Sequence, residues 1–228
     1  MTVDIVTHIS RPRMSTYTLR CPDDEARALE LYRANADISG SAYTAIHYFE
    51  VMFRNALDRQ LRAWNDADRG TPDWALDTAP LLLSALGDDR LAAARRDAAR
   101  AVGRRRPVTQ DDVVAQLSFG AWRYLLPSAR HRGKQTLWDE ALQHAFTNLG
   151  GIRPEQIVNS VSIVYDFRNR IAHHEPVFAL DLRGKRKAMR DVLNSIGPTA
   201  RRWFVAHEPL SAALDDFYAD WPEFARTN

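Results

Sequence analysis

The residues best suited to chemistry lie in one short stretch of the C-terminal half, FRNRIAHHEPVF at residues 167–178. It holds two arginines, an asparagine and two adjacent histidines, namely Arg168, Asn169, Arg170, His173 and His174. A guanidinium can hold the charge of a phosphate, and an imidazole can move a proton near neutral pH. RNA strand scission requires these two functions, because RNA supplies its own nucleophile, the 2′-hydroxyl. The stretch therefore indicates acid–base chemistry at a phosphate.

A helix must position these side chains. Pro154 is typical of a first helical residue, and we expect a helix over 154–174 that rotates by about 100° per residue. Arg168 then shares one face with the apolar residues Ile157, Val161, Val164, Tyr165 and Ala172. A guanidinium on such a face needs an anionic partner or a cleft. Because Pro176 ends the helix, both histidines are expected in its last turn, where the helix dipole favours a protonated imidazole.

The same spacing also has a purely structural interpretation. Arg168 can pair with Asp166 or Glu50, and a histidine can cap the carbonyl groups at a helix end. Spacing alone leaves this alternative open. Metal catalysis is disfavoured, because HHE at 173–175 lacks the H-E-x-x-H spacing and adjacent helical side chains diverge by about 100°. We therefore expect no metal ligands and no cofactor.

The rest of the chain predicts an all-α fold, because apolar residues recur at spacings of three and four and no segment alternates as a strand does. We expect helices at 24–37 and 41–65, separated by Gly40, and at 89–103, with a short helical piece around LLLSAL. A capping box of Thr109 and Asp112 predicts one helix that carries VVAQLSFGAWRYLL and ends before Pro127. A basic turn HRGK, a helix over TLWDEALQHAF that stops at Gly150–Gly151, and about three helices after Pro176 complete the chain.

Length and composition are those of a globular protein. The chain has 228 residues, 45% apolar and 26% charged, and no segment suggests a linker between domains. We expect one helical domain over 24–228, preceded by an extension at 1–23. Neither a signal peptide nor a membrane span is evident, so we expect a cytoplasmic protein. The single cysteine, Cys21, excludes an internal disulfide.

Basic residues gather in two segments, although the net charge is only +2. Residues 90–106 contain seven arginines, Arg90, Arg95, Arg96, Arg100, Arg104, Arg105 and Arg106, against one acidic residue. Residues 183–190 contain five basic residues and no acidic residue. Such segments can neutralise RNA phosphates, and we expect Arg104, Arg105 and Arg106 to do so. A solvated helix face or loop is the alternative.

FRNRIAHHEPVF resembles the R-N-x3-H signature of the HEPN superfamily, in particular of the Abi-like (abortive infection) proteins of bacteria. The segments SAYTAIHYFEVMFRNALDRQL, FGAWRYLL and LWDEALQHAF are similar to that family in the same order, so the resemblance covers roughly 24–220. It implies a HEPN-type helical bundle and a metal-independent endoribonuclease that serves phage defence or a toxin–antitoxin system.

The resemblance also implies roles for individual residues. The family's arginine, polar residue and histidine fall on Arg168, Asn169 and His173, with His174 as an additional candidate for proton transfer. Its helix-one residues fall on three positions, Glu50, Arg54 and Asn55, of which Glu50 would hold Arg168. Arg54, Asn55 and Arg170 would contact the RNA.

The resemblance further implies a homodimer whose composite site brings two copies of the motif together. Two alternatives remain open at this point. The protein can be a non-catalytic RNA-binding or regulatory partner, or a toxin that a bound antitoxin protein or RNA keeps silent.

Overall fold

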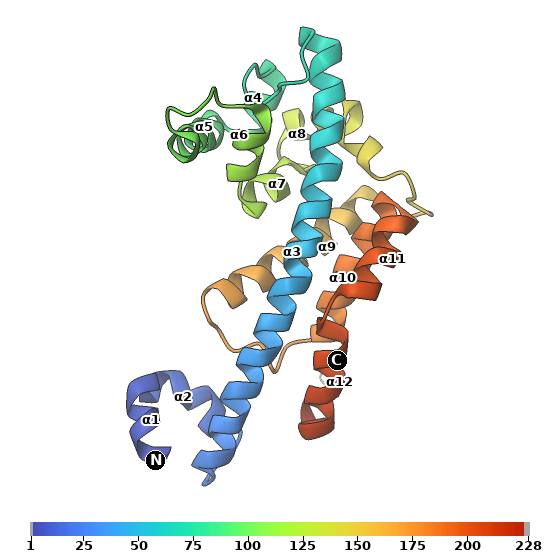
Figure 1. Cartoon of the computed structure of the whole chain (residues 1–228). Coiled ribbons are helices and arrows are strands. Elements are labelled where there is room, and N and C mark those ends of the chain that lie inside the picture. Colours follow the sequence, from blue (N-terminus) through green and yellow to red (C-terminus); the bar gives the residue numbers. More distant parts are fainter. Residues whose placement is uncertain (1, 226–228) are drawn as a thin grey trace. The chain divides into compact units, whose positions relative to one another are not determined.

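The prediction of an all-α fold is confirmed by a computed structural model of the chain, which describes residues 2–225, with side chains from residue 5 onward (Figure 1). This part of the chain forms twelve α-helices and two short 3-10 helices, and it contains no strand. None of the helices in the described residues is both long and apolar enough to cross a membrane.

The helices pack into two compact units. Unit 1 comprises the described residues up to His47, Asp166–Lys187 and the described residues from His207 onward. Unit 2 comprises Tyr48–Tyr165 and Ala188–Ala206. Four helices, α3, α9, α10 and α11, contain residues of both units, so the chain passes between the units inside helices and not through a linker.

Unit 1 is built from both ends of the chain. It contains α1 (Thr2–Ile9), α2 (Arg11–Thr18), the first half of α3 (Glu25–Arg69), the end of α9 (Pro154–Ala172), the start of α10 (Leu182–Ile196), α12 (Leu210–Asp220) and η2 (Pro222–Phe224). The described part of the segment expected as an extension, 1–23, thus contains two helices, and it buries Met14, Tyr17 and Cys21. The Ser10 hydroxyl caps α2 by accepting a hydrogen bond from the Arg13 N–H.

Gly40 does not interrupt the chain, so the expected break between 37 and 41 is wrong. Helix α3 runs without interruption over 45 residues, Glu25–Arg69, and its ribbon is continuous in Figure 1. A mid-helix glycine costs about 1 kcal/mol relative to alanine, which the many favourable helix formers on both sides of it offset. A Cβ atom placed on Gly40 would meet no other atom within 4 Å, so the missing side chain leaves open space beside α3.

Unit 2 contains the second half of α3, α4 (Pro80–Leu86), α5 (Asp88–Val102), α6 (Gln110–Gln116), α7 (Phe119–Leu125), α8 (Arg132–Glu140), η1 (Leu142–Ala145), most of α9 and α10, and α11 (Pro198–His207). Aromatic rings fill its core: Phe49 stacks on Phe53, and Phe119 packs edge-on against both. Trp74 donates a hydrogen bond of 2.8 Å to the buried carboxylate of Asp58.

The capping box is confirmed, but the single helix predicted after it is wrong. Thr109 accepts a hydrogen bond from the Asp112 N–H, and the Asp112 carboxylate accepts one from the Thr109 N–H. The helix then breaks at Leu117, whose backbone is extended, and the Ser118 hydroxyl caps α7. The basic turn HRGK is also incorrect, because α8 already begins at Arg132 with His131 as its cap.

The helix from Pro154 is confirmed, although it ends at Ala172 and not at residue 174. Its buried face consists of Ile157, Val161, Val164, Phe167 and Ile171. Phe167 therefore occupies the place on this face that the sequence assigned to Arg168. Arg168 is half-buried at the edge of the face, and Ala172 is exposed.

Candidate functional site

Helix α9 ends in a Schellman motif built from the predicted histidines. The His173 N–H donates to the Asn169 carbonyl at 2.9 Å, the last bond of the helical ladder. The His174 N–H then donates to the Ile171 carbonyl at 3.0 Å, and the Glu175 N–H reaches back to the Arg170 carbonyl at 2.9 Å. These two bonds define the motif, in which His174 takes the position that glycine usually occupies.

His174 has a left-handed backbone, with φ of 56°. This conformation costs an ordinary L-residue roughly 1–2 kcal/mol, although histidine adopts it more often than most. A contact within unit 1 holds the residue in place: an Arg13 guanidinium nitrogen donates to the His174 carbonyl at 2.5 Å. The Arg170 and Glu175 side chains, which flank the turn, form an ion pair of 3.6 Å. These contacts therefore constrain the backbone that carries the His174 imidazole.

The chain after the histidines is fixed by one buried amide of α3. The Asn35 Oδ1 atom accepts hydrogen bonds from the N–H groups of Val177 and Phe178, at 2.7 and 3.1 Å. Asn35, Val177 and Phe178 are all buried. The Phe178 ring also packs against Tyr17 and Phe224, with centroid distances of 5.4 and 5.0 Å. The segment that follows the motif is thus anchored to the core of unit 1.

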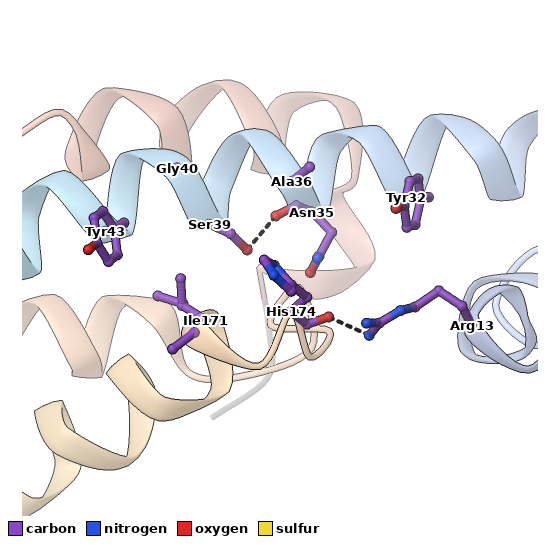
Figure 2. Close-up of a pocket in the computed structure, with 10 residues that line it drawn as sticks. Arg13, Tyr32, Asn35, Ala36, Ser39, Gly40, Tyr43, Ile171 and His174 are labelled. Atoms are coloured by element: carbon purple, nitrogen blue, oxygen red, sulfur yellow. Dashed lines mark hydrogen bonds between the residues drawn. The ribbon is translucent and has the colours of Figure 1, made fainter. Parts of the chain in front are cut away.

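A pocket of about 570 Å³ lies beside this helix end, within unit 1 (Figure 2). Its lining comes from α2, one face of α3 and the end of α9: Arg13, Tyr32, Asn35, Ala36, Ser39, Gly40, Tyr43, Ile171, Ala172 and His174. Figure 2 shows the His174 ring directed toward α3, while its carbonyl faces Arg13. His173 is exposed but is not part of the lining. The structure therefore brings His174, the additional histidine, to the pocket.

The remaining polar residues of the motif differ in their surroundings. Arg168 and Asn169 are half-buried, and Arg170 is exposed and paired with Glu175. Within the described residues, no hydrogen bond or ion pair holds the ring of His173. Nor does that part of the chain contain a group of three or more histidine, cysteine or acidic side chains that could bind a metal ion.

The helix-one residues of the predicted site belong to unit 2. Glu50 and Arg54 are half-buried, Asn55 is exposed, and the Arg54 Nε donates to the Asn55 amide oxygen at 3.3 Å. The expected contact between Glu50 of unit 2 and Arg168 of unit 1 stays a prediction.

Some of the arginines of 90–106 form contacts within the protein, and others are exposed and able to contact RNA. Arg95 donates to the Ala75 and Leu76 carbonyls and to the Thr78 hydroxyl, which ties α5 to the segment between α3 and α4. Arg106 pairs with Asp112 of the capping box, at 2.5 and 2.7 Å. This pair and the Thr109 bonds hold the pKa of the Asp112 carboxyl well below its usual range. Arg106 thus has a structural role that the sequence did not indicate.

Three arginines of this segment are exposed and make no hydrogen bond or ion pair to another described residue, namely Arg96, Arg104 and Arg105. Arg100 pairs with Asp97, and Arg90 lies over the Tyr124 ring, 4.1 Å from its centroid. The available part of the first basic segment is therefore smaller than its seven arginines suggested.

In the second basic segment, Arg186 donates at 2.6 Å to the buried carboxylate of Glu208. The other Glu208 oxygen accepts from the Ser211 N–H at 3.2 Å and so satisfies one donor of the first turn of α12. Arg183 lies near Asp215 and over the Tyr218 ring. Two of the five basic residues of this segment, Arg183 and Arg186, thus make contacts within unit 1.

Lys134 of α8 is a further unusual cation. Its ammonium lies 3.0 Å from the centroid of the Tyr124 ring, and its residue is buried. Desolvation, followed by the charges of Arg90 and Arg123, lowers its pKa from 10.5 to about 8. The Tyr124 ring stabilises the ammonium form and offsets part of this effect.

Several pocket residues were missed by the sequence reasoning. Arg13 lies in a segment read as an extension, although Ser10 followed by Pro12 is a recognisable helix start. The sequence predicts a break at Gly40, whereas a glycine inside a helical pattern is also tolerated and can have a packing or functional reason. The role of Asn35 gave no local signal, because its partners lie more than 140 residues away.

Comparisons of the chain with protein-family models, with curated proteins and with solved structures found no match. The resemblance carried by FRNRIAHHEPVF therefore stays a prediction.

Proposed function

We propose that the protein is a metal-independent endoribonuclease of the Abi-like, HEPN type. The observation that carries the proposal is the end of α9, where two exposed imidazoles follow Arg168 and one of them lines a pocket. Exposed histidines beside a pocket can exchange protons with a ligand, and an arginine on the same helix end can face its phosphate. The pocket lining contains no carboxylate, which favours an anionic ligand.

The proposed reaction is internal transesterification of RNA. An imidazole of His173 or His174 takes the proton of the 2′-hydroxyl, and the 2′-oxygen forms a bond to phosphorus. The bond from phosphorus to the 5′-oxygen breaks, and an imidazolium gives that oxygen a proton. Arg168 balances the added negative charge of the transition state, which is the largest contribution expected in such a site. The products are a 2′,3′-cyclic phosphate and a 5′-hydroxyl end.

The other predicted residues have supporting roles in this proposal. Asn169 orients Arg168 or a histidine, Glu50 holds Arg168, and Arg54, Asn55 and Arg170 contact the RNA strand. The ion pair between Arg170 and Glu175 must open or share its arginine for that contact.

We further propose that the active form is a homodimer. One arginine and one proton-transferring histidine are a sparse catalytic set, and an isologous interface doubles it by bringing two identical helix ends together. Light scattering at micromolar concentration should give twice the mass of one chain. A monomer that retains full nuclease activity would overturn this part of the proposal.

In the cell, such an enzyme would act in phage defence or as the toxin of a toxin–antitoxin pair. An antitoxin protein or RNA would then keep it silent. This context follows from the proposed family and not from a contact within the chain.

The test is incubation of the purified protein with mixed cellular RNA in EDTA. We expect cleavage that leaves 2′,3′-cyclic phosphate ends, and we expect the His173→Ala, His174→Ala double variant to lose about 10²–10⁴ in rate. The matched control is His144→Ala, which removes an exposed histidine of unit 2. Cleavage that survives the double substitution, or that requires added magnesium, would refute the mechanism.

A non-catalytic RNA-binding or regulatory protein is the second candidate. The contacts that favour it are those between Arg13 and the His174 carbonyl and between Arg170 and Glu175, because they give part of the cluster a structural use. RNA that binds the protein and stays intact would support this candidate over the nuclease.

A further inference from the structure

The pocket beside His174 has the dimensions of a small-molecule site. Its volume of about 570 Å³ lies within the range of roughly 300–1,000 Å³ typical of ligand pockets. Ala36 and Gly40, one helical turn apart on α3, keep the floor of the pocket free of bulky side chains. Because a Cβ atom on Gly40 would meet nothing within 4 Å, the space above this glycine is open.

Aromatic side chains flank that open floor. Tyr32 and Tyr43 stand about three turns apart on α3, on either side of Ala36 and Gly40 (Figure 2). Tyr43 is 54% exposed, which leaves a ring face available for stacking. Tyr32 is half-buried, and its ring is fixed by an edge-on contact with Tyr17 at 5.3 Å between centroids. The pocket thus offers one fixed ring and one accessible ring.

The polar groups of the pocket complement a nucleotide. Ser39, His174 and Arg13 contribute hydroxyl, imidazole and guanidinium groups, and no acidic residue lines the pocket. The oxygen of the buried Asn35 amide is already bound to the Val177 and Phe178 N–H groups. A cationic ligand would find no counter-charge there. Unpaired RNA bases are recognised by stacking on aromatic rings together with hydrogen bonds to their edges, which is the combination present.

The backbone of His174 connects this pocket with the motif. A non-glycine residue in the left-handed region is a strain that the surrounding contacts must maintain, and such strain is often found at functional positions. Here the Schellman bonds and Arg13 maintain it, and the ring lines the pocket as a result. A base held against α3 would place its ribose and phosphate beside this imidazole.

From these observations we propose that the pocket formed by α2, α3 and the end of α9 binds the base of one unpaired nucleotide of an RNA strand. The proposal rests on the endoribonuclease function for the identity of its ligand. It goes beyond that function because it adds a preference for unpaired RNA and assigns this preference to Tyr43 and to the open floor at Gly40.

The test uses Gly40→Leu, which fills the floor of the pocket. Replacing a mid-helix glycine by leucine raises helix propensity, so this variant should fold at least as well as the wild-type protein. The matched control is Ala26→Leu, which adds a leucine at an exposed position of the same helix outside the pocket. A second variant, Tyr43→Ala, removes the accessible ring.

The probe is a short single-stranded RNA with 2′-O-methyl groups, which cannot be cleaved, and the readout is fluorescence anisotropy at fixed salt. We expect Gly40→Leu and Tyr43→Ala to weaken binding about 5- to 150-fold, the range that a lost base–aromatic stack gives. Ala26→Leu should bind like the wild-type protein, and a double-stranded probe of the same sequence should bind more weakly.

Unchanged binding by folded Gly40→Leu would overturn the pocket proposal, even if cleavage of ordinary RNA by the wild-type protein upholds the nuclease. Conversely, binding that depends on Gly40 and Tyr43 in a protein that cleaves nothing would uphold the pocket and refute the nuclease. A third outcome is that free mononucleotides displace the probe and that longer single strands bind no more tightly than the mononucleotides. In that case the pocket is a mononucleotide site and the RNA assignment is wrong.

Discussion

Asn35 should be one of the most sensitive residues of unit 1, because a single side-chain oxygen satisfies two buried N–H groups. Asn35→Ala removes the acceptor of the Val177 and Phe178 N–H groups, at 2.7 and 3.1 Å, and both of these residues are buried. A buried donor left unpaired costs about 1–3 kcal/mol. The substitution should therefore lower the free energy of unfolding by about 2–6 kcal/mol, a large part of the usual 5–15 kcal/mol.

Urea denaturation followed by circular dichroism measures this loss, and amide hydrogen exchange locates it at Val177 and Phe178. The matched control is Ser39→Ala, which removes a hydroxyl that donates at 2.7 Å to the backbone carbonyl of Asn35 and should cost less than about 1 kcal/mol. Asn35→Asp keeps an acceptor and should retain more stability than Asn35→Ala. A loss below about 0.5 kcal/mol, with both amides still protected, would show that the two bonds do not hold this segment.

Three further substitutions test contacts elsewhere in the two units. Lys134→Met should stabilise the protein at pH 7 by on the order of 1 kcal/mol. Folding lowers the pKa of Lys134 from 10.5 to about 8, so the wild-type protein becomes more stable as the pH rises from about 8 to 10.5. The stability advantage of Lys134→Met over the wild-type protein, measured by urea denaturation, should therefore shrink by pH 10. Glu208→Gln leaves the half-buried Arg186 without its counter-ion and should lower the free energy of unfolding by about 3 kcal/mol. A midpoint of urea unfolding equal to that of the wild-type protein would contradict this prediction. Arg106→Ala should destabilise the protein at pH 7. The difference in stability from the wild-type protein should decrease as the pH falls below 3.8, because the interaction of Asp112 with Arg106 stabilises the fold only while the Asp112 carboxyl is ionised. An NMR titration of Asp112 checks the direction of its pKa shift.

Local signals predicted most of the helices. Thr109 and Asp112 form the expected capping box, and Pro154 begins the expected helix, because both features depend on neighbours within one turn. Ser118 shows where local reasoning was incomplete. It is a good N-cap residue, but the apolar periodicity on both sides of it favoured one uninterrupted helix.

The candidate site was predictable only in part, because its geometry depends on contacts that are distant in the chain. The motif residues were identified from their types, yet the rotation of α9 places Phe167, not Arg168, on the buried face. The left-handed backbone of His174 could not be read from the sequence, because glycine is the residue that usually signals it. Arg13 reaches this turn from 161 positions away, and no periodic pattern records such a contact.

Cys21 gives the protein an internal reporter of motion in unit 1. It is the single thiol of the chain, its residue is 9% exposed, and burial raises its pKa. A thiolate-specific reagent should thus label folded molecules slowly, and each labelling event should record a transient opening around the α2–α3 turn. The labelling rate then distinguishes changes in unit 1 from changes in unit 2. Substitutions that loosen the packing around Asn35 should increase the labelling rate, whereas substitutions of Lys134 should leave the labelling rate unchanged. The opening kinetics of unit 1 can be followed without introducing a label site.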